Sequence, residues 1–195
     1  MVPNFSDTGF YRFVAEVPPD APLVFLSRIE RIKGAHTAIE IAQRAGRRLI
    51  FAGNRVETGE GLEYWRSEIE PRLAPGRVEY VGAVNDDQKN ELLGRAAAML
   101  VPIEWDEPFG IVFAESLACG TPVISCPRGA LPEIVVPGEH GFLVRSVAEG
   151  VEAVAAIPSI SRAACRARCE ELYSRRVVVT QYEELYRKLV TGLRA

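Results

Sequence analysis

The sequence predicts an α/β fold in which helices cover both faces of a mostly parallel sheet, and two observations support that prediction. Short apolar runs alternate with amphipathic stretches along most of the chain. The runs are continuous rather than alternating with polar residues, which is typical of strands buried on both faces. The chain has 195 residues, the length of one domain. We therefore expect residues 1–195 to form a single domain.

The strands and helices follow from these patterns in chain order. Continuous apolar runs bounded by turn residues predict strands at 22–27, 47–53, 77–84, 99–103, 122–126 and 141–144. Periodic apolar residues predict helices at 35–45, within 60–73, at 86–98 and at 110–119, with one helical turn at 131–135. Gly46 and Gly120 end the helices that precede them, and Asn85 with Gln88 forms a start similar to a capping box.

The C-terminal part, residues 147–195, is expected to be helical. Its last segment places a set of apolar side chains on one stripe, namely Val178, Tyr182, Leu185, Leu189 and Leu193. An apolar stripe on a helix is normally covered by a neighbour. Here the neighbour could be this domain or another domain that is missing from the chain.

Composition argues against several classes of protein. A formal net charge of -3 indicates no excess of basic residues to bind the phosphates of a nucleic acid, so a nucleic-acid partner is not expected. No secretory signal is seen, and no run approaches the roughly 18 apolar residues of a membrane span. Four cysteines without a C-x-x-C pair predict no metal site, although Cys165 and Cys169 could form half of one instead of packing in the core. We expect no metal and a reducing, cytoplasmic location.

The first loop of chemical interest follows the strand at 22–27. Ligands of an open parallel sheet bind beyond the carboxyl ends of its strands. There Arg28 and Lys33 precede a helix start, and Gly34 lets the backbone approach closely. The two cations could cradle a diphosphate or form a solvated basic loop. The G-x-G-x-x-G, P-loop and G-x-S-x-G patterns are absent, which argues against dinucleotide-binding proteins, P-loop hydrolases and α/β-hydrolases.

Two glutamates mark the stretch "EPFGIVFAE". Glu107 precedes a helix, and Glu115 lies inside it among apolar residues. Beside the free N–H groups of the helix start, such carboxylates could accept hydrogen bonds from sugar hydroxyls. Alternatively, Glu107 complements the helix dipole and Glu115 is an exposed surface acid. A further loop, 82–87, could face a flat ring or be an ordinary turn.

Four phrases, "SRIERIKG", "VGAVND", "EPFGIVFAESLACGTPV" and "GALPEIVVPGEHGFLV", together resemble the donor-binding domain of retaining GT-B glycosyltransferases. This family includes glycogen and sucrose-phosphate synthases and bacterial mannosyltransferases. The resemblance covers about positions 1–145, and its strongest element is the E-x7-E motif of Glu107 and Glu115. It implies a Rossmann-like three-layer α/β/α domain, the C-terminal half of a GT-B fold.

The resemblance also implies roles for individual residues. Arg28 and Lys33 would hold the diphosphate of a nucleotide-sugar donor and stabilise it as it leaves. Glu107 would contact hydroxyls of the transferred sugar, and Glu115 would contact the ribose. The other implied contacts are backbone groups of Phe109, Gly110 and Ile111 to the sugar and phosphates, and Val84 against the base. Enzymes of this family generally need no metal, and the donor is a substrate rather than a cofactor.

The family has two Rossmann-like domains, and the N-terminal one recognises the acceptor. The opening "VPNFSDTGFYRF" resembles the segment between them, so we expect residues 1–20 to be hinge-like and the acceptor domain or subunit to be missing. Any membrane association would be peripheral and through that missing part. Two other functions remain open: a non-catalytic module that binds a nucleotide sugar or carbohydrate and regulates a partner, and a fragment of a GT-B-like nucleotide-sugar 2-epimerase.

Overall fold

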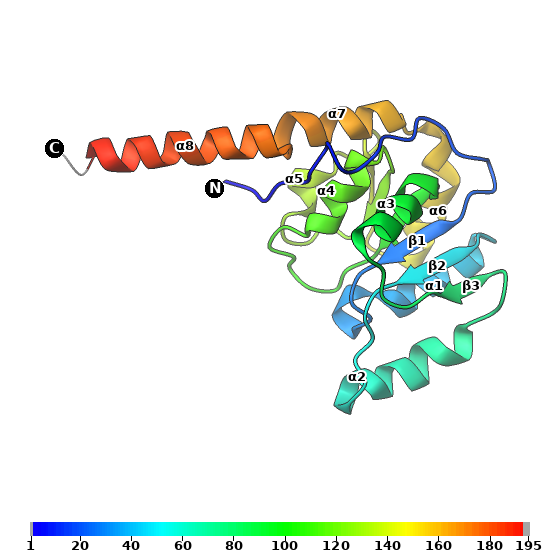
Figure 1. Cartoon of the computed structure of the whole chain (residues 1–195). Coiled ribbons are helices and arrows are strands. Elements are labelled where there is room, and N and C mark those ends of the chain that lie inside the picture. The colour runs from blue at the N-terminus through cyan, green and yellow to red at the C-terminus, as the bar shows by residue number, and fades with distance from the viewer. Residues whose placement is uncertain (1, 193–195) are drawn as a thin grey trace.

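The computed structural model describes residues 2–192, and its centre is a six-stranded sheet in the order β3-β2-β1-β4-β5-β6 (Figure 1). Every neighbouring pair of strands is parallel. The strands are β1 (Leu23–Leu26), β2 (Leu49–Ala52), β3 (Val78–Tyr80), β4 (Ala98–Val101), β5 (Val123–Ser125) and β6 (Gly141–Leu143). The α/β class and the parallel sheet are therefore confirmed.

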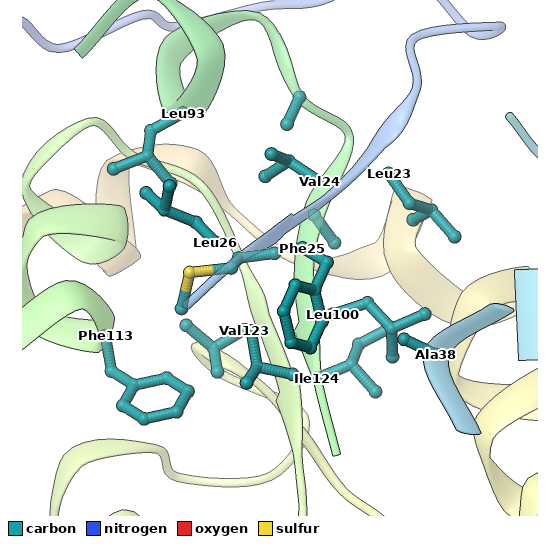
Figure 2. Close-up of a cluster of buried hydrophobic side chains, with 14 of the residues drawn as sticks. Leu23, Val24, Phe25, Leu26, Ala38, Leu93, Leu100, Phe113, Val123 and Ile124 are labelled. Carbon is teal, nitrogen blue, oxygen red and sulfur yellow. The ribbon is translucent and has the colours of Figure 1, made fainter. Parts of the chain in front are cut away.

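Helices cover both faces of this sheet. The α-helices of the described residues are α1 (Ala35–Arg44), α2 (Gly59–Tyr64), α3 (Asp86–Arg95), α4 (Ile111–Ala118), α5 (Leu131–Ile134), α6 (Val147–Ala156), α7 (Arg162–Leu172) and α8 (Arg175–Gly192). Helix α1 packs on α6, whereas α4 packs on α3 and α7. Figure 2 shows Ala38 of α1 on one side of the strand residues and Leu93 of α3 and Phe113 of α4 on the other.

The core lies where β1 is sandwiched between these helix layers. All four residues of β1, Leu23 to Leu26, are buried, and the ring of Phe25 packs on Phe51 of β2 with 5.1 Å between centroids. Because both faces of β1 are covered, its sequence carries no polar alternation. The continuous apolar run was therefore the correct strand signal.

Two element boundaries differ from the sequence prediction by more than two residues. The helix expected at 86–98 ends at Arg95, because Ala96 has an extended backbone and the Ala97 N–H donates to the carbonyl of Pro22 at 2.8 Å. Alanine favours a helix intrinsically, but pairing beside β1 draws this run into the sheet. The strand expected at 77–84 is limited to β3, and Gly82 beyond it adopts a left-handed backbone (φ 81°).

The helix expected within 60–73 is interrupted. Helix α2 continues into a π-helical turn at Trp65–Ile69 and a 3₁₀ turn at Glu70–Arg72. Pro71 explains the change of hydrogen-bonding pattern at the end, since proline lacks the N–H group that an α-helix would use there.

The N-terminal segment runs beside α7 and the start of α8, where the Ser6 N–H donates to the carbonyl of Tyr173 at 2.8 Å (Figure 1). Helix α8 projects away from the sheet layers (Figure 1). Val178 of its apolar stripe is buried, but Tyr182, Leu185 and Leu189 are exposed. Leu193 lies outside the described residues. Among the described residues of the stripe, only Val178 therefore packs on this domain. Among residues 2–192, the structure holds no helix with the length and apolar character needed to cross a membrane.

Candidate functional site

The candidate site forms where the loops after β1 and β4 meet. These strands are neighbours, but α1 and α4 leave them toward opposite faces, which makes this position the switch point of the sheet. The Glu104 N–H donates to the carbonyl of Ile32 at 2.8 Å, tying the two loops together. A Cβ on Gly34 would lie 1.9 Å from the carbonyl oxygen of Pro102, so only glycine fits this crossing.

Lys33 and Glu107 form an ion pair across this crossing. Lys33 Nζ lies 2.6 Å from Oε2 of Glu107, and the indole N–H of Trp105 donates to the same oxygen at 3.1 Å. The Lys33 ammonium also lies 4.3 Å from the centroid of the Trp105 ring. Lys33 is only 7% exposed, so this is a largely desolvated, charge-neutral cluster. The predicted cation and the predicted carboxylate are thus direct partners.

The backbone around Glu107 is fixed by a third loop. The Ala130 N–H donates to the carbonyl of Glu107 at 2.8 Å. A Cβ on Gly129 would lie 2.2 Å from that carbonyl oxygen, and Gly129 has a left-handed φ of 55°. The phrase "GALPEI" therefore contributes close backbone packing behind Glu107 rather than a side chain.

Glu115 lies in a second cluster with residues that the sequence analysis did not single out. Its Oε1 accepts hydrogen bonds from the hydroxyl of Tyr11 at 2.6 Å and from Lys89 Nζ at 2.8 Å. Glu115 is 8% exposed, so the alternative of an exposed surface acid is wrong. Burial and the neighbouring Glu115 raise the pKa of Tyr11. Burial by itself would lower the pKa of Lys89, but its bonds to Glu115 and Asp86 outweigh that effect and raise it.

The start of α4 lies between the two glutamates. Gly110 is its N-cap, with a left-handed φ of 75° and no side chain to accept from the first N–H groups. Phe109 is buried with its ring edge against Tyr173, which anchors this turn, while Ile111 is exposed. A Cβ on Gly110 would lie 2.5 Å from the ring of Phe113. An uncapped helix start with fixed geometry is suited to an anion or a hydroxyl-bearing ligand.

Two predicted residues lie at the margin. Arg28 has 62% of its side chain exposed and pairs with Glu30 at 3.0 Å, so the structure does not bring it to Lys33. Val84 is half-buried and packs against the core in the loop before α3. Both residues follow strands at the same edge of the sheet as Glu107.

The site residues that sequence reasoning missed are Tyr11, Lys89 and Trp105. Tyr11 and Glu115 are separated by 104 positions, so no local spacing links them. Trp105 precedes Glu107 by two residues in the sequence, and this proximity was the one sequence signal that pointed to Trp105. Among residues 2–192, no group of three or more His, Cys, Asp or Glu side chains is arranged to hold a metal ion. Cys165 and Cys169 are fully buried and belong to the core.

A cavity of about 550 Å³ lies beside this region at the carboxyl ends of β4, β5 and β6. Its polar lining includes Thr37, Glu104, Asp106, Arg128, Arg145 and Ser146. Neither Lys33 nor Glu107 nor Glu115 lines it. The predicted chemistry therefore lies next to this cavity and not inside it.

Comparison with known proteins places this geometry in a family. The model for the family "Glycosyl transferases group 1" matches residues 10–168. A glycogen synthase from Mycobacterium tuberculosis is 29% identical over 186 residues, covering 89% of this chain and 44% of its own length. An alpha-maltose-1-phosphate synthase from Mycolicibacterium smegmatis is 31% identical over 188 residues, covering 86% of this chain and 48% of its own. The chain thus spans less than half the length of these curated relatives.

Solved structures share the fold over nearly the whole chain. AviGT4, a glycosyltransferase of avilamycin A biosynthesis, has a TM-score of 0.79 and 27% identity, covering 98% of this chain and 58% of its own. The sucrose-phosphate synthase from Thermosynechococcus elongatus has a TM-score of 0.80 and 26% identity, covering 98% and 52%. HepE from Anabaena, solved with UDP-glucose, has a TM-score of 0.75 at 21% identity, covering 96% and 56%, and shows the fold alone. The Rossmann-like three-layer domain of a GT-B fold is thus confirmed.

Proposed function

Because the chain belongs to the group 1 family of glycosyltransferases, we propose that it binds the nucleotide-diphosphate sugar donor of a retaining, metal-independent transferase. The observation that carries the proposal is a pair of lysine-bound carboxylates on the loop and helix after β4. Lys33 holds Glu107 at 2.6 Å and Lys89 holds Glu115 at 2.8 Å. Fixed, ionised carboxylates accept strong hydrogen bonds, and sugar hydroxyls are suitable donors.

In this proposal Glu107 accepts hydrogen bonds from hydroxyls of the transferred sugar, and Glu115 accepts them from hydroxyls of the ribose. Lys33 can also donate a hydrogen bond to the diphosphate, because its ammonium has three protons and only one of them is donated to Glu107. Negative charge grows on the diphosphate as the bond to the sugar breaks. Lys33, joined by the exposed side chain of Arg28, stabilises that charge.

The uncapped start of α4 completes the donor site. The backbone groups of Phe109, Gly110 and Ile111 face the sugar and phosphates, supported by the positive end of the helix dipole. Val84, in the loop before α3, lies against the base. The fold relative HepE was solved with UDP-glucose, which supports a nucleotide sugar as the class of ligand.

The acceptor, in this proposal, is held by a part of the enzyme outside these 195 residues. The curated relatives are about twice as long as the matched region, which leaves length for another domain.

The four cysteines are all free thiols, which supports a reducing, cytoplasmic location.

Calorimetric titration with UDP-glucose, ADP-glucose and GDP-mannose tests donor binding. At least one of them should bind at millimolar concentration or better and raise the melting temperature. Replacing Glu115→Gln removes a charged acceptor, so affinity for that donor should fall about tenfold or more.

The matched control is Glu184→Gln, which removes the same charge from an exposed position on α8. It should leave the affinity unchanged. The proposal fails if none of the three donors binds, or if Glu184→Gln weakens binding as much as Glu115→Gln does. Binding without transfer, once the rest of the enzyme is supplied, would instead identify a non-catalytic module.

A further inference from the structure

Glu115 is held by donors that lie outside the four phrases on which the resemblance to a donor-binding domain rests. The hydroxyl of Tyr11, in the N-terminal segment, donates to Oε1 at 2.6 Å. Lys89 of α3 donates to the same oxygen at 2.8 Å and also pairs with Asp86 at 3.0 Å. Two distant parts of the chain therefore donate to one carboxylate oxygen of a third part, helix α4.

This arrangement leaves the two oxygens of Glu115 unequal. A carboxylate oxygen has about two acceptor sites, and both sites of Oε1 are used. Within residues 2–192, no hydrogen bond to Oε2 is found, and the side chain is 10% exposed. A ligand hydroxyl that reaches Glu115 would therefore be accepted by Oε2.

Tyr11 is itself held firmly. The guanidinium of Arg166 donates to the Tyr11 carbonyl at 2.8 Å. On either side of Tyr11, the Arg12 N–H donates to Oδ1 of Asn90 at 3.0 Å, and the Asn90 amide donates to the carbonyl of Phe10 at 3.3 Å. The ring edge packs on Phe10. A tyrosine fixed at its backbone and ring holds its hydroxyl in one place.

The Tyr11 hydroxyl also stays a donor at physiological pH. Burial and the charge of Glu115 raise its pKa, so the phenol remains protonated. Lys89 alone would fix the carboxylate less well, because its head ends a flexible four-carbon stem that Asp86 also attracts.

We propose that Tyr11 is a positioning residue, which orients Glu115 so that Oε2 accepts a ribose hydroxyl and the site prefers ribonucleotides to dideoxyribonucleotides. This inference rests on the proposed donor-binding function. The preference arises because a ribose hydroxyl can donate a hydrogen bond to the fixed, charged Oε2. A dideoxynucleotide has no hydroxyl there and leaves Oε2 without this bond. Without the Tyr11 hydroxyl, the Glu115 carboxylate can rotate into orientations in which Oε2 no longer accepts from the ribose hydroxyl.

The test is a binding cycle with Tyr11→Phe, which removes one oxygen and keeps the buried ring. Affinities are measured for UDP, ADP and GDP and for their 2′,3′-dideoxy forms, and the best-bound base is followed. Tyr11→Phe should lower the preference for the ribonucleotide about three- to tenfold, with less than about a twofold change for the dideoxy form. Lys89→Gln should act in the same direction. Tyr182→Phe, an exposed hydroxyl on α8, should change neither affinity.

The outcomes separate the two proposals. If the unmodified chain binds none of the three diphosphates, the donor-binding function fails and this inference with it. If it binds them but Tyr11→Phe weakens the ribo and dideoxy forms equally, Tyr11 is merely structural and this inference alone is overturned. Equal affinities for the ribo and dideoxy forms in the unmodified chain would overturn it as well.

Discussion

At the scale of single residues, Gly34 shows how tightly the candidate site is built. It has a left-handed φ of 74° and lies under the carbonyl of Pro102, between Lys33 and the start of α1. An alanine there would be strained by its backbone angle and would also meet backbone atoms that cannot move aside. The close approach is what lets Lys33 reach Glu107.

Gly34→Ala should therefore destabilise the chain by about 3 kcal/mol or more and weaken nucleotide binding. Gly46→Ala is the matched control, because Gly46 has a similar φ of 65° but a Cβ added there would meet nothing within 4 Å. That change should cost about 1 kcal/mol, the strain of the backbone angle alone. Urea unfolding of both variants measures the difference. Equal losses would show that the contact with Pro102 contributes nothing.

The sequence was informative about which charged residues belong to the candidate site and silent about how they pair. Glu107 and Lys33 were each recognisable from their place after a strand. Their ion pair joins positions 74 apart, and the bond from Tyr11 to Glu115 joins positions 104 apart. Such contacts depend on the register of β1 against β4 and on the path of the N-terminal segment. Neither the register of these strands nor the path of that segment produces a periodic pattern in the sequence.

At the scale of elements, α7 ties the N-terminal segment to the layer that carries Glu115. Arg162, its first residue, donates to the carbonyls of Val14, Ala96 and Gly94 at 2.6 to 2.9 Å. It also donates to the hydroxyl of Thr121 at 2.9 Å. Among the described residues no carboxylate forms a salt bridge with Arg162, and burial lowers the pKa of its guanidinium. The guanidinium thus serves as a buried hub of hydrogen bonds.

Arg162→Met should lower the free energy of unfolding by about 3 kcal/mol, because several buried acceptors lose a charged donor at once. The exposed Arg187 of α8, which pairs with Glu183 at 3.1 Å, offers a comparison. Arg187→Met should change stability by less than about 0.5 kcal/mol. Thermal and urea unfolding of the two variants check this. Similar small effects would mean that water replaces the guanidinium in the Arg162 site.

Element types were predictable where periodicity was strong, and element ends were not. The apolar run of β1 and the capping box of Asn85 with Gln88 both appear as expected. The run Ala96 to Ala98 was predicted as the end of the helix at 86–98, yet Ala98 pairs with Leu23 in the sheet. Local propensity is worth tenths of a kcal/mol per residue, so burial beside β1 decides the outcome.

At the scale of the whole molecule, most of α8 extends beyond the sheet and its helix layers. Its apolar stripe begins at the buried Val178 and continues over exposed residues, with Leu189 55% exposed. Helices stabilised by packing normally bury such a face. The stripe was visible in the sequence, but whether this domain covers it depended on the direction in which α8 leaves α7.

The exposed part of the stripe should contribute little to the stability of this chain and should promote its self-association. Replacing Leu185→Lys and Leu189→Lys together should change the free energy of unfolding by less than about 1 kcal/mol, since neither side chain is buried. Light scattering over a range of concentrations should show less association for this double variant than for the unmodified chain. Val178→Ala is the contrasting change, because it empties a buried position on the same helix and should cost about 2 kcal/mol. A loss of several kcal/mol from the double lysine variant would instead show that the outer stripe packs on the domain in solution.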